Sequence, residues 1–254
     1  MNYYFFLYLE GYANRLNIPR FKNDSSHKPD MELYAASVRD GAWHFYRPEA
    51  IVDQNFWYVD ANTETQNDLF FICLPDEFEL QKKSERLIYL NDYTKTAPDY
   101  RCNILIKNNV GGFTSYQSEY PFGMIGRRGG LMSSIDTLKN DSGKLNALFI
   151  RNVFHEPIQD KYPATILEAA NNTVLDEIEL RTNTSNFIDL APFRGHNGLY
   201  VMANGFLGVP VYFSEGPSGA LSMEHTHPPH ESVRGPSMPA LVKRYRDEIA
   251  KKIR

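Results

Sequence analysis

Three of the chain's seven histidines lie between Glu224 and Glu231, in the sequence EHTHPPHE. Ordinary packing rarely needs such a cluster. Imidazole nitrogens and carboxylate oxygens are ligands that transition metals take in proteins. The stretch therefore predicts a metal site formed by His225, His227, His230 and Glu231.

The spacing of these residues suits an extended chain that then turns. Side chains two residues apart in a strand point to the same face, so His225 and His227 can share one ion. The next two residues are prolines, which lack the N–H donor that a strand ladder needs, so the strand must end there. A turn would bring His230 and Glu231 back toward the ion. Such a set suits a divalent transition metal such as zinc, iron or manganese, and imidazole does not choose among them.

Two other interpretations of the histidine stretch stand beside the metal site. A His-X-His sequence before prolines can form a hydrogen-bonded corner in which Glu224 or Glu231 orients an imidazole. One histidine could instead act without metal as a general base. His155 and His196 are predicted to lie in loops, and either could complete a metal shell across a sheet.

The register of the stretch resembles the first motif of the cupin superfamily, G(x)5HxH(x)3E. Gly219, His225, His227 and Glu231 occupy its positions. The resemblance implies that the two histidines and the glutamate bind a metal on a small β-barrel. The glycine expected later in the motif is Met238 here, and the 23 residues after Glu231 leave no room for the family's second motif. We therefore take the site geometry from the resemblance, and not the family.

A second candidate site is the sequence Gly126-Arg127-Arg128-Gly129-Gly130. Adjacent arginines between glycines let guanidinium groups and main-chain N–H groups approach an anion closely. Arg127 and Arg128 are thus candidates to bind a phosphate, a sulfate or a carboxylate. The glycine spacing fits neither a Walker motif nor a dinucleotide-binding motif. An exposed turn is the alternative interpretation.

Composition limits the classes of function. The net charge of −4 offers no electrostatic footprint for nucleic acid. No apolar run approaches the length of a membrane span, and the first residues lack the basic region of a signal peptide. We therefore expect a cytoplasmic protein that does not bind membranes, with export by machinery that leaves no N-terminal signal as the alternative. Cys73 and Cys102 lie in apolar runs and are expected to be buried thiols, with a disulfide as the alternative. No feature indicates the oligomeric state.

The elements around these sites are predicted to be strands. Aromatic residues form 13% of the chain and fit half-buried sheet surfaces. Short apolar or alternating runs between turn residues are typical of antiparallel strands. The prediction is a mainly β protein, an antiparallel, jelly-roll-like β-sandwich built as one unit or as two β subdomains. The predicted strands are residues 3–9, 43–46, 56–59, 69–74, 87–90, 102–106, 147–154, 164–169, 174–180, 187–190, 199–203, 209–213 and 220–225.

One predicted strand carries an exception to its own pattern. Val174, Asp176, Ile178 and Leu180 share a face that is apolar except for Asp176. Between the strands, residues 12–30 and the Gly- and Ser-rich residues 108–143 are predicted to be mostly loop, and residues 31–38 fit either a helix or a strand.

The chain is predicted to have three parts. Residues 1–142 form an aromatic-rich β region, residues 143–235 a β-sandwich region with the histidine cluster, and residues 236–254 a terminal helix. In the last part, Leu241, Tyr245, Ile249 and Ile253 recur every four residues, as on the apolar face of an amphipathic helix.

Three functions suit these observations. The first is a metal-dependent enzyme acting on a small polar or anionic, sugar-like substrate, in which the metal polarises a carbonyl or activates water and Arg127 and Arg128 hold an anionic group. The second is a non-enzymatic protein that binds a glycan or belongs to a larger assembly, which the aromatic strands and the lack of a standard catalytic motif favour. The third is a structural metal that ties the last strand to the terminal helix.

Overall fold

In the computed structural model, half of the residues are in strands and 8% are helical. Every strand pairing in the described ranges is antiparallel, which confirms the predicted mainly β, antiparallel class. No helix in these ranges is long and apolar enough to cross a membrane. The structure describes residues 1–20, 30–94, 101–126, 131–135, 140–168, 173–203, 205–224 and 251. The predicted terminal helix, residues 236–254, therefore lies outside the described residues except for Lys251.

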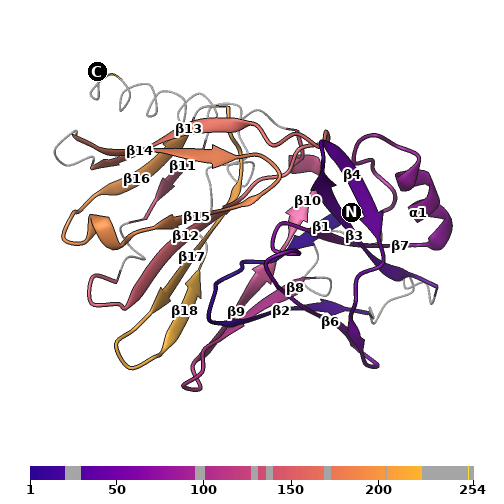
Figure 1. Ribbon diagram of the computed structural model, residues 1–254, viewed down its shortest axis with the longest axis horizontal. Helices are drawn as coiled ribbons and strands as arrows, with labels where there is room; N and C mark the ends of the chain where they lie inside the picture. Colours follow the sequence, from indigo (N-terminus) through magenta and orange to yellow (C-terminus); the bar gives the residue numbers. More distant parts are fainter. Residues whose placement is uncertain are drawn as a thin grey trace.

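The first half of the chain forms two five-stranded sheets, at the right of Figure 1. One sheet contains, in spatial order, β10 (Tyr120–Pro121), β1 (Asn2–Phe5), β7 (Leu69–Cys73), β3 (Glu32–Arg39) and β4 (Ala42–Tyr46). The other contains β5 (Ile51–Val52), β6 (Phe56–Asp60), β2 (Ala13–Pro19), β8 (Cys102–Lys107) and β9 (Phe113–Ser118). Both sheets contribute side chains to one core cluster, among them Tyr3, Phe5, Leu16, Ile18, Phe70 and Ile104.

The second half forms two four-stranded sheets, at the left of Figure 1. One contains β11 (Leu131–Ser134), β16 (Leu199–Ala203), β13 (Lys161–Glu168) and β14 (Thr173–Arg181). The other contains β15 (Ser185–Asp189), β12 (Leu145–Arg151), β17 (Val209–Glu215) and β18 (Leu221–Glu224). The helical segments within the described ranges include α1 (Pro75–Lys82), η2 (Phe122–Met124) and η3 (Ala191–Phe193).

The sheet that contains β12 is covered on both faces. Ala147 and Phe149 of β12 belong to the core cluster of the first half, whereas Leu148 and Ile150 belong to the cluster shared with the sheet of β13 and β16. The neighbouring strand β17 alternates in the same way. Burial on both faces explains the continuous apolar runs at residues 147–150 of β12 and 209–213 of β17. This sheet is therefore the layer through which the two halves of the chain are packed together.

Several segments differ from the sequence-based prediction. Residues 13–19, predicted as loop, form β2, with Asn14, Leu16 and Ile18 buried. The period-two pattern is present there, but polar residues at both kinds of position conceal it. The Gly- and Ser-rich region contains β9, β10 and β11, and residues 31–38 lie largely in β3. Residues 87–90, predicted as a strand, join no sheet. Cys73 and Cys102 are buried free thiols, as predicted.

Candidate binding groove

Both sites predicted from the sequence fall outside the described residues. This applies to the proposed metal ligands His225, His227, His230 and Glu231 and to the proposed anion-binding residues Arg127 and Arg128. The strand that leads to the histidines is described: β18 ends at the exposed Glu224 and pairs with β17 at the edge of its sheet. The two sites stay predictions.

The two loop histidines have partners in the fold. His155 Nδ1 lies 2.9 Å from the carbonyl oxygen of Leu87, and its ring packs edge-on against Phe122. His196 Nδ1 lies 3.2 Å from a carboxylate oxygen of Glu168. Across the described part of the chain, no group of three or more His, Cys, Asp or Glu side chains is placed to hold a metal ion.

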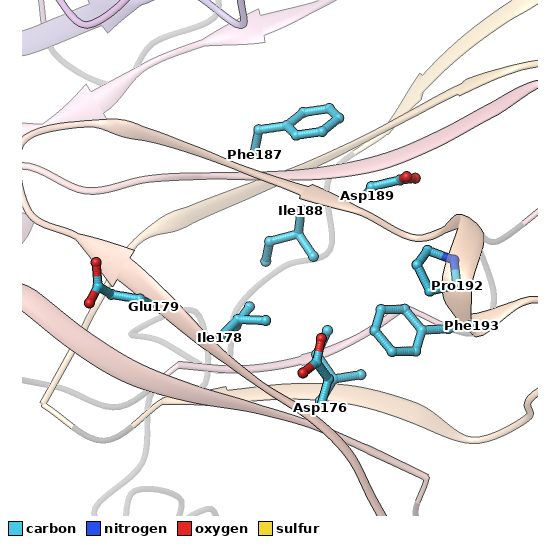
Figure 2. Close-up of a pocket in the computed structure, with 9 residues that line it drawn as sticks. Asp176, Ile178, Glu179, Phe187, Ile188, Asp189, Pro192 and Phe193 are labelled. Atoms are coloured by element: carbon cyan, nitrogen blue, oxygen red, sulfur yellow. The ribbon is translucent and has the colours of Figure 1, made fainter.

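A groove opens between the last two sheets, on the side where β14 and β15 lie (Figure 2). Its volume is about 210 Å³, below the range of about 300–1,000 Å³ common for small-molecule pockets. Figure 2 shows Ile178 of β14 and Ile188 of β15 pointing toward each other, whereas Phe187 points away. The lining residues are Ile166, Asp176, Ile178, Glu179, Phe187, Ile188, Asp189, Pro192 and Phe193. The groove is therefore suited to one or two side chains of a larger partner.

The groove explains why Asp176 interrupts an apolar face. Leu180, on the same face of β14, is 1% exposed, while Asp176 is exposed because the two sheets no longer close over it. The pairing of β13 with β14 changes register beside it, since Ile166 faces Asp176 but Leu167 faces Val174. Such a bulge bends a strand locally. The open side begins where β14 departs from regular pairing.

Each of the two strands beside the groove has one edge without a partner strand in the described chain. The N–H of Leu190 donates to the carbonyl of Asn146 on β12. Because hydrogen-bonding direction alternates along an antiparallel pair, Ile188 also faces β12, and Phe187 and Asp189 direct their main-chain groups outward. The open edge of β15 thus offers donors and acceptors to an added strand.

Asn186 closes one end of this open side. Its Oδ1 accepts a hydrogen bond from the N–H of Arg181 at 2.6 Å, and its Nδ2 donates to the Arg181 carbonyl at 2.9 Å. The outward main-chain groups at this end of β14 are thereby satisfied. Farther along β14, the N–H of Glu177 donates to the Asp176 carboxylate at 2.8 Å. The edge of β15 is consequently the more open of the two.

The rim of the groove is acidic. One carboxylate oxygen of Glu179 lies 3.0 Å from Lys161 Nζ, and the other lies 3.5 Å from Arg181 Nη2. These ion pairs are solvent-exposed and contribute little to stability. Asp176 and Asp189 have no ion pair within the described residues; the carboxylate of Asp189 accepts a hydrogen bond from the N–H of Ala191 at the start of η3. A partner would meet negative charge on both sides of an apolar floor.

A larger hollow lies in the first half of the chain. Its volume is about 530 Å³, and Arg20, Glu32 and Trp57 line it together with Asp30. Arg20 packs over the ring of Trp57, with its guanidinium carbon 5.4 Å from the ring centroid, and Glu32 pairs with Arg47. Arg20 and Asp30 border residues 21–29, which lie outside the described ranges.

The groove was not predicted from the sequence. The one signal for it was Asp176, an acidic residue on an otherwise apolar strand face. Comparison with known proteins adds nothing to this site, because no family model, no curated protein and no solved structure matches the chain.

Proposed function

We propose that this chain is a non-catalytic β-sandwich protein that binds an extended polypeptide in the groove between β14 and β15. The observation that carries the proposal is the edge of β15, which has no partner strand among the described residues, beside an apolar groove. An extended peptide can add a strand to such an edge, where main-chain hydrogen bonds supply affinity and pockets for alternate side chains supply specificity.

The unprotected character of this edge supports the proposal. Proteins usually cover or blunt their edge strands, because exposed edges template aggregation. Asn186 provides such cover at one end of the groove only. Phe187 of β15 remains 50% exposed, so a large apolar side chain is available there for contact with a partner.

The packing of β15 also supports a binding role. Ile188 is 6% exposed, and the ring of Phe187 packs edge-on against Phe149 of β12, at a centroid distance of 5.4 Å. The Oγ of Ser185 donates to the carbonyl of Phe6 in the first half of the chain, at 3.0 Å. An edge strand that both halves already hold in place loses less conformational entropy when a partner binds.

The sandwich in this proposal has a jelly-roll-like order of strands. In the second half, β12 lies between β15 and β17, and β16 lies between β11 and β13, so most neighbours are distant in sequence. The local hairpins β13–β14 and β17–β18 complete the two sheets. The amphipathic helix proposed for residues 236–254 follows this unit.

The test is a selection of short random peptides displayed on phage, with the full chain as the immobilised target. Phe187→Pro removes the outward N–H of β15 without removing a bond to β12, and Phe187→Ala keeps that N–H while removing the ring. We expect peptides that bind the native chain and Phe187→Ala but lose binding to Phe187→Pro. Thermal melting of both variants checks that the fold is retained.

Two results would contradict the proposal. One is a selection that yields no peptide whose binding depends on the groove. The other is a set of peptides that bind Phe187→Pro and Ile178→Asp as well as they bind the native chain, since Ile178→Asp places a charge in the apolar floor.

A further inference from the structure

The occupant of the groove can be specified further from the charges around it, and this step rests on the proposed function. Phe187 and Asp189 share one face of β15, and Ile188 lies on the other face, toward the groove. An added antiparallel strand would place one residue opposite each of these three. Directly opposite residues have side chains about 5 Å apart and interact.

The chemistry preferred at each of the three positions follows from its neighbour. The residue opposite Ile188 faces the floor, which Ile178 and Phe193 also line, so it should be apolar. The residue opposite Phe187 meets an exposed ring and should be apolar or aromatic. The residue opposite Asp189 meets a carboxylate without an ion pair in the described structure, so it should be Lys or Arg.

Asp176 on the facing strand strengthens the preference for a cation. It lines the groove opposite β15 and has no ion pair within the described residues. A strand between Asp176 and Asp189 lies in negative potential from both sides. Charges closer together than the Debye length, which is about 8 Å at physiological salt, are only partly screened.

The same charges argue against a second copy of this chain as the occupant. Antiparallel pairing of two β15 strands through their outward main-chain groups would place Asp189 opposite Phe187, another Asp189 or Ser185, depending on the register. The first arrangement sets a carboxylate against an apolar ring, and the second sets like charges opposite each other, which is destabilising. The third needs the N–H of Ser185, which already donates to the Asn67 side chain at 3.0 Å. The chain as a whole carries a net charge of −4.

We propose that the groove binds an extended basic segment of another polypeptide. That segment adds antiparallel to β15 and carries a Lys or Arg followed directly by two apolar residues. Because the pairing is antiparallel, the basic residue lies opposite Asp189, the next residue opposite Ile188 and the third opposite Phe187.

The experiment uses two capped synthetic peptides and the full-length chain. The first peptide, Ser-Thr-Arg-Val-Phe-Thr-Ser, has the proposed motif, and the second replaces its arginine with glutamate. Binding is followed by the chemical shifts of backbone amides. We expect the arginine peptide to bind the native chain at least about fivefold more tightly than the glutamate peptide, and this preference to shrink at high salt.

A charge exchange tests the register. Asp189→Lys should reverse the preference, so that the glutamate peptide becomes the tighter ligand. Asp189→Asn keeps an acceptor for the N–H of Ala191 and should merely reduce the preference. As a matched control, Glu156→Lys changes an exposed carboxylate outside the groove lining and should leave the preference unchanged.

The outcomes separate this inference from the proposed function. Equal binding of the two peptides, or no reversal in Asp189→Lys, would overturn the basic motif. If the phage selection still yields peptides that depend on the N–H of Phe187, the peptide-binding function stands without it. If neither synthetic peptide binds and the selection yields no such peptide, both proposals are wrong.

Discussion

The Nη2 atom of Arg151, at the end of β12, donates a hydrogen bond to the main-chain carbonyl of Asn67 in the first half of the chain, 2.9 Å away. Arg151 is completely buried, and Asp68, the residue after Asn67, is only 1% exposed. Burial lowers the pKa of Arg151 to about 10, an effect that the Asp68 carboxylate opposes. The arginine therefore stays charged at neutral pH, and a buried cation donates a hydrogen bond from one half of the chain to the other.

Arg151→Met should destabilise the protein strongly. The variant leaves the Asn67 carbonyl without its donor and removes the cation near the buried Asp68 carboxylate. Leaving a buried acceptor without its donor costs roughly 1–3 kcal/mol. Urea unfolding measures the loss. Arg181→Met is the matched control, because Arg181 is exposed and its pairing with Glu179 is weak, so it should change the free energy of unfolding by less than about 1 kcal/mol.

Asp68 should make stability depend on pH. Burial raises the pKa of its carboxyl from the usual 3.8 to about 6, although the hydrogen bond from Tyr46 and the charge of Arg151 oppose the shift. The folded state therefore holds a proton that the unfolded state has already lost between these two values. The stability that the protonated Asp68 carboxyl contributes is present below about pH 4 and is lost as pH rises through 6. Over this range the free energy of unfolding falls by about 3 kcal/mol in total.

Asp68→Asn isolates that contribution. The free energy of unfolding of the native chain minus that of the variant should fall as pH rises from about 4 to about 7. Urea unfolding at a series of pH values measures this difference. A difference that does not change with pH would mean that Asp68 has the same pKa in the folded and unfolded states.

Gly112 should tolerate no side chain. A Cβ at this position would lie 2.1 Å from the carbonyl oxygen of Gly219 and 2.9 Å from Asn108 Nδ2. The turn after β8 and the turn before β18 would have to separate. We expect Gly112→Ala to cost about 1–3 kcal/mol, as overpacking typically does, and to speed amide exchange in both turns.

A control is available in the same turn before β18. A Cβ on Gly216 would make an ordinary contact of 3.7 Å with the carbonyl oxygen of Ala220. Gly216→Ala should therefore leave the melting temperature nearly unchanged. Equal effects of the two substitutions would argue against close contact between the two turns.

The metal site predicted at His225, His227, His230 and Glu231 is tested by elemental analysis of protein purified without a histidine tag. A bound zinc, iron or manganese ion should be present in stoichiometric amount and lost in His225→Ala. His44→Ala changes a histidine outside the stretch and should retain the metal. Protein with no metal above background, and a His225→Ala variant of unchanged stability, would exclude the site.

Chelation distinguishes the two roles of such a metal. A structural ion contributes to the free energy of folding, so its removal should collapse the melting transition. An ion in an open catalytic site should shift the melting temperature only modestly. The same comparison in His225→Ala should show no effect of chelator.

Much of the strand content could be predicted because it depends on neighbouring residues. The run from Leu199 to Ala203 alternates buried and half-buried side chains and forms β16 with the predicted bounds. Helix α1 was missed, although Pro75 opens it and the Glu77 carboxylate accepts a hydrogen bond from the N–H of Leu74. Eight residues with little apolar periodicity provide a weak helical signal.

The candidate groove could not be predicted in the same way. Local periodicity was sufficient to identify a mainly β chain, since each strand's alternation is encoded in its own residues. Which strand lies at an edge, and which face stays open, depends on pairings such as β12 with β15 and β17. Asp176 on β14 and Asp189 on β15 flank one groove because strands of two different sheets meet there. That proximity is a product of sheet order, which no local pattern specifies.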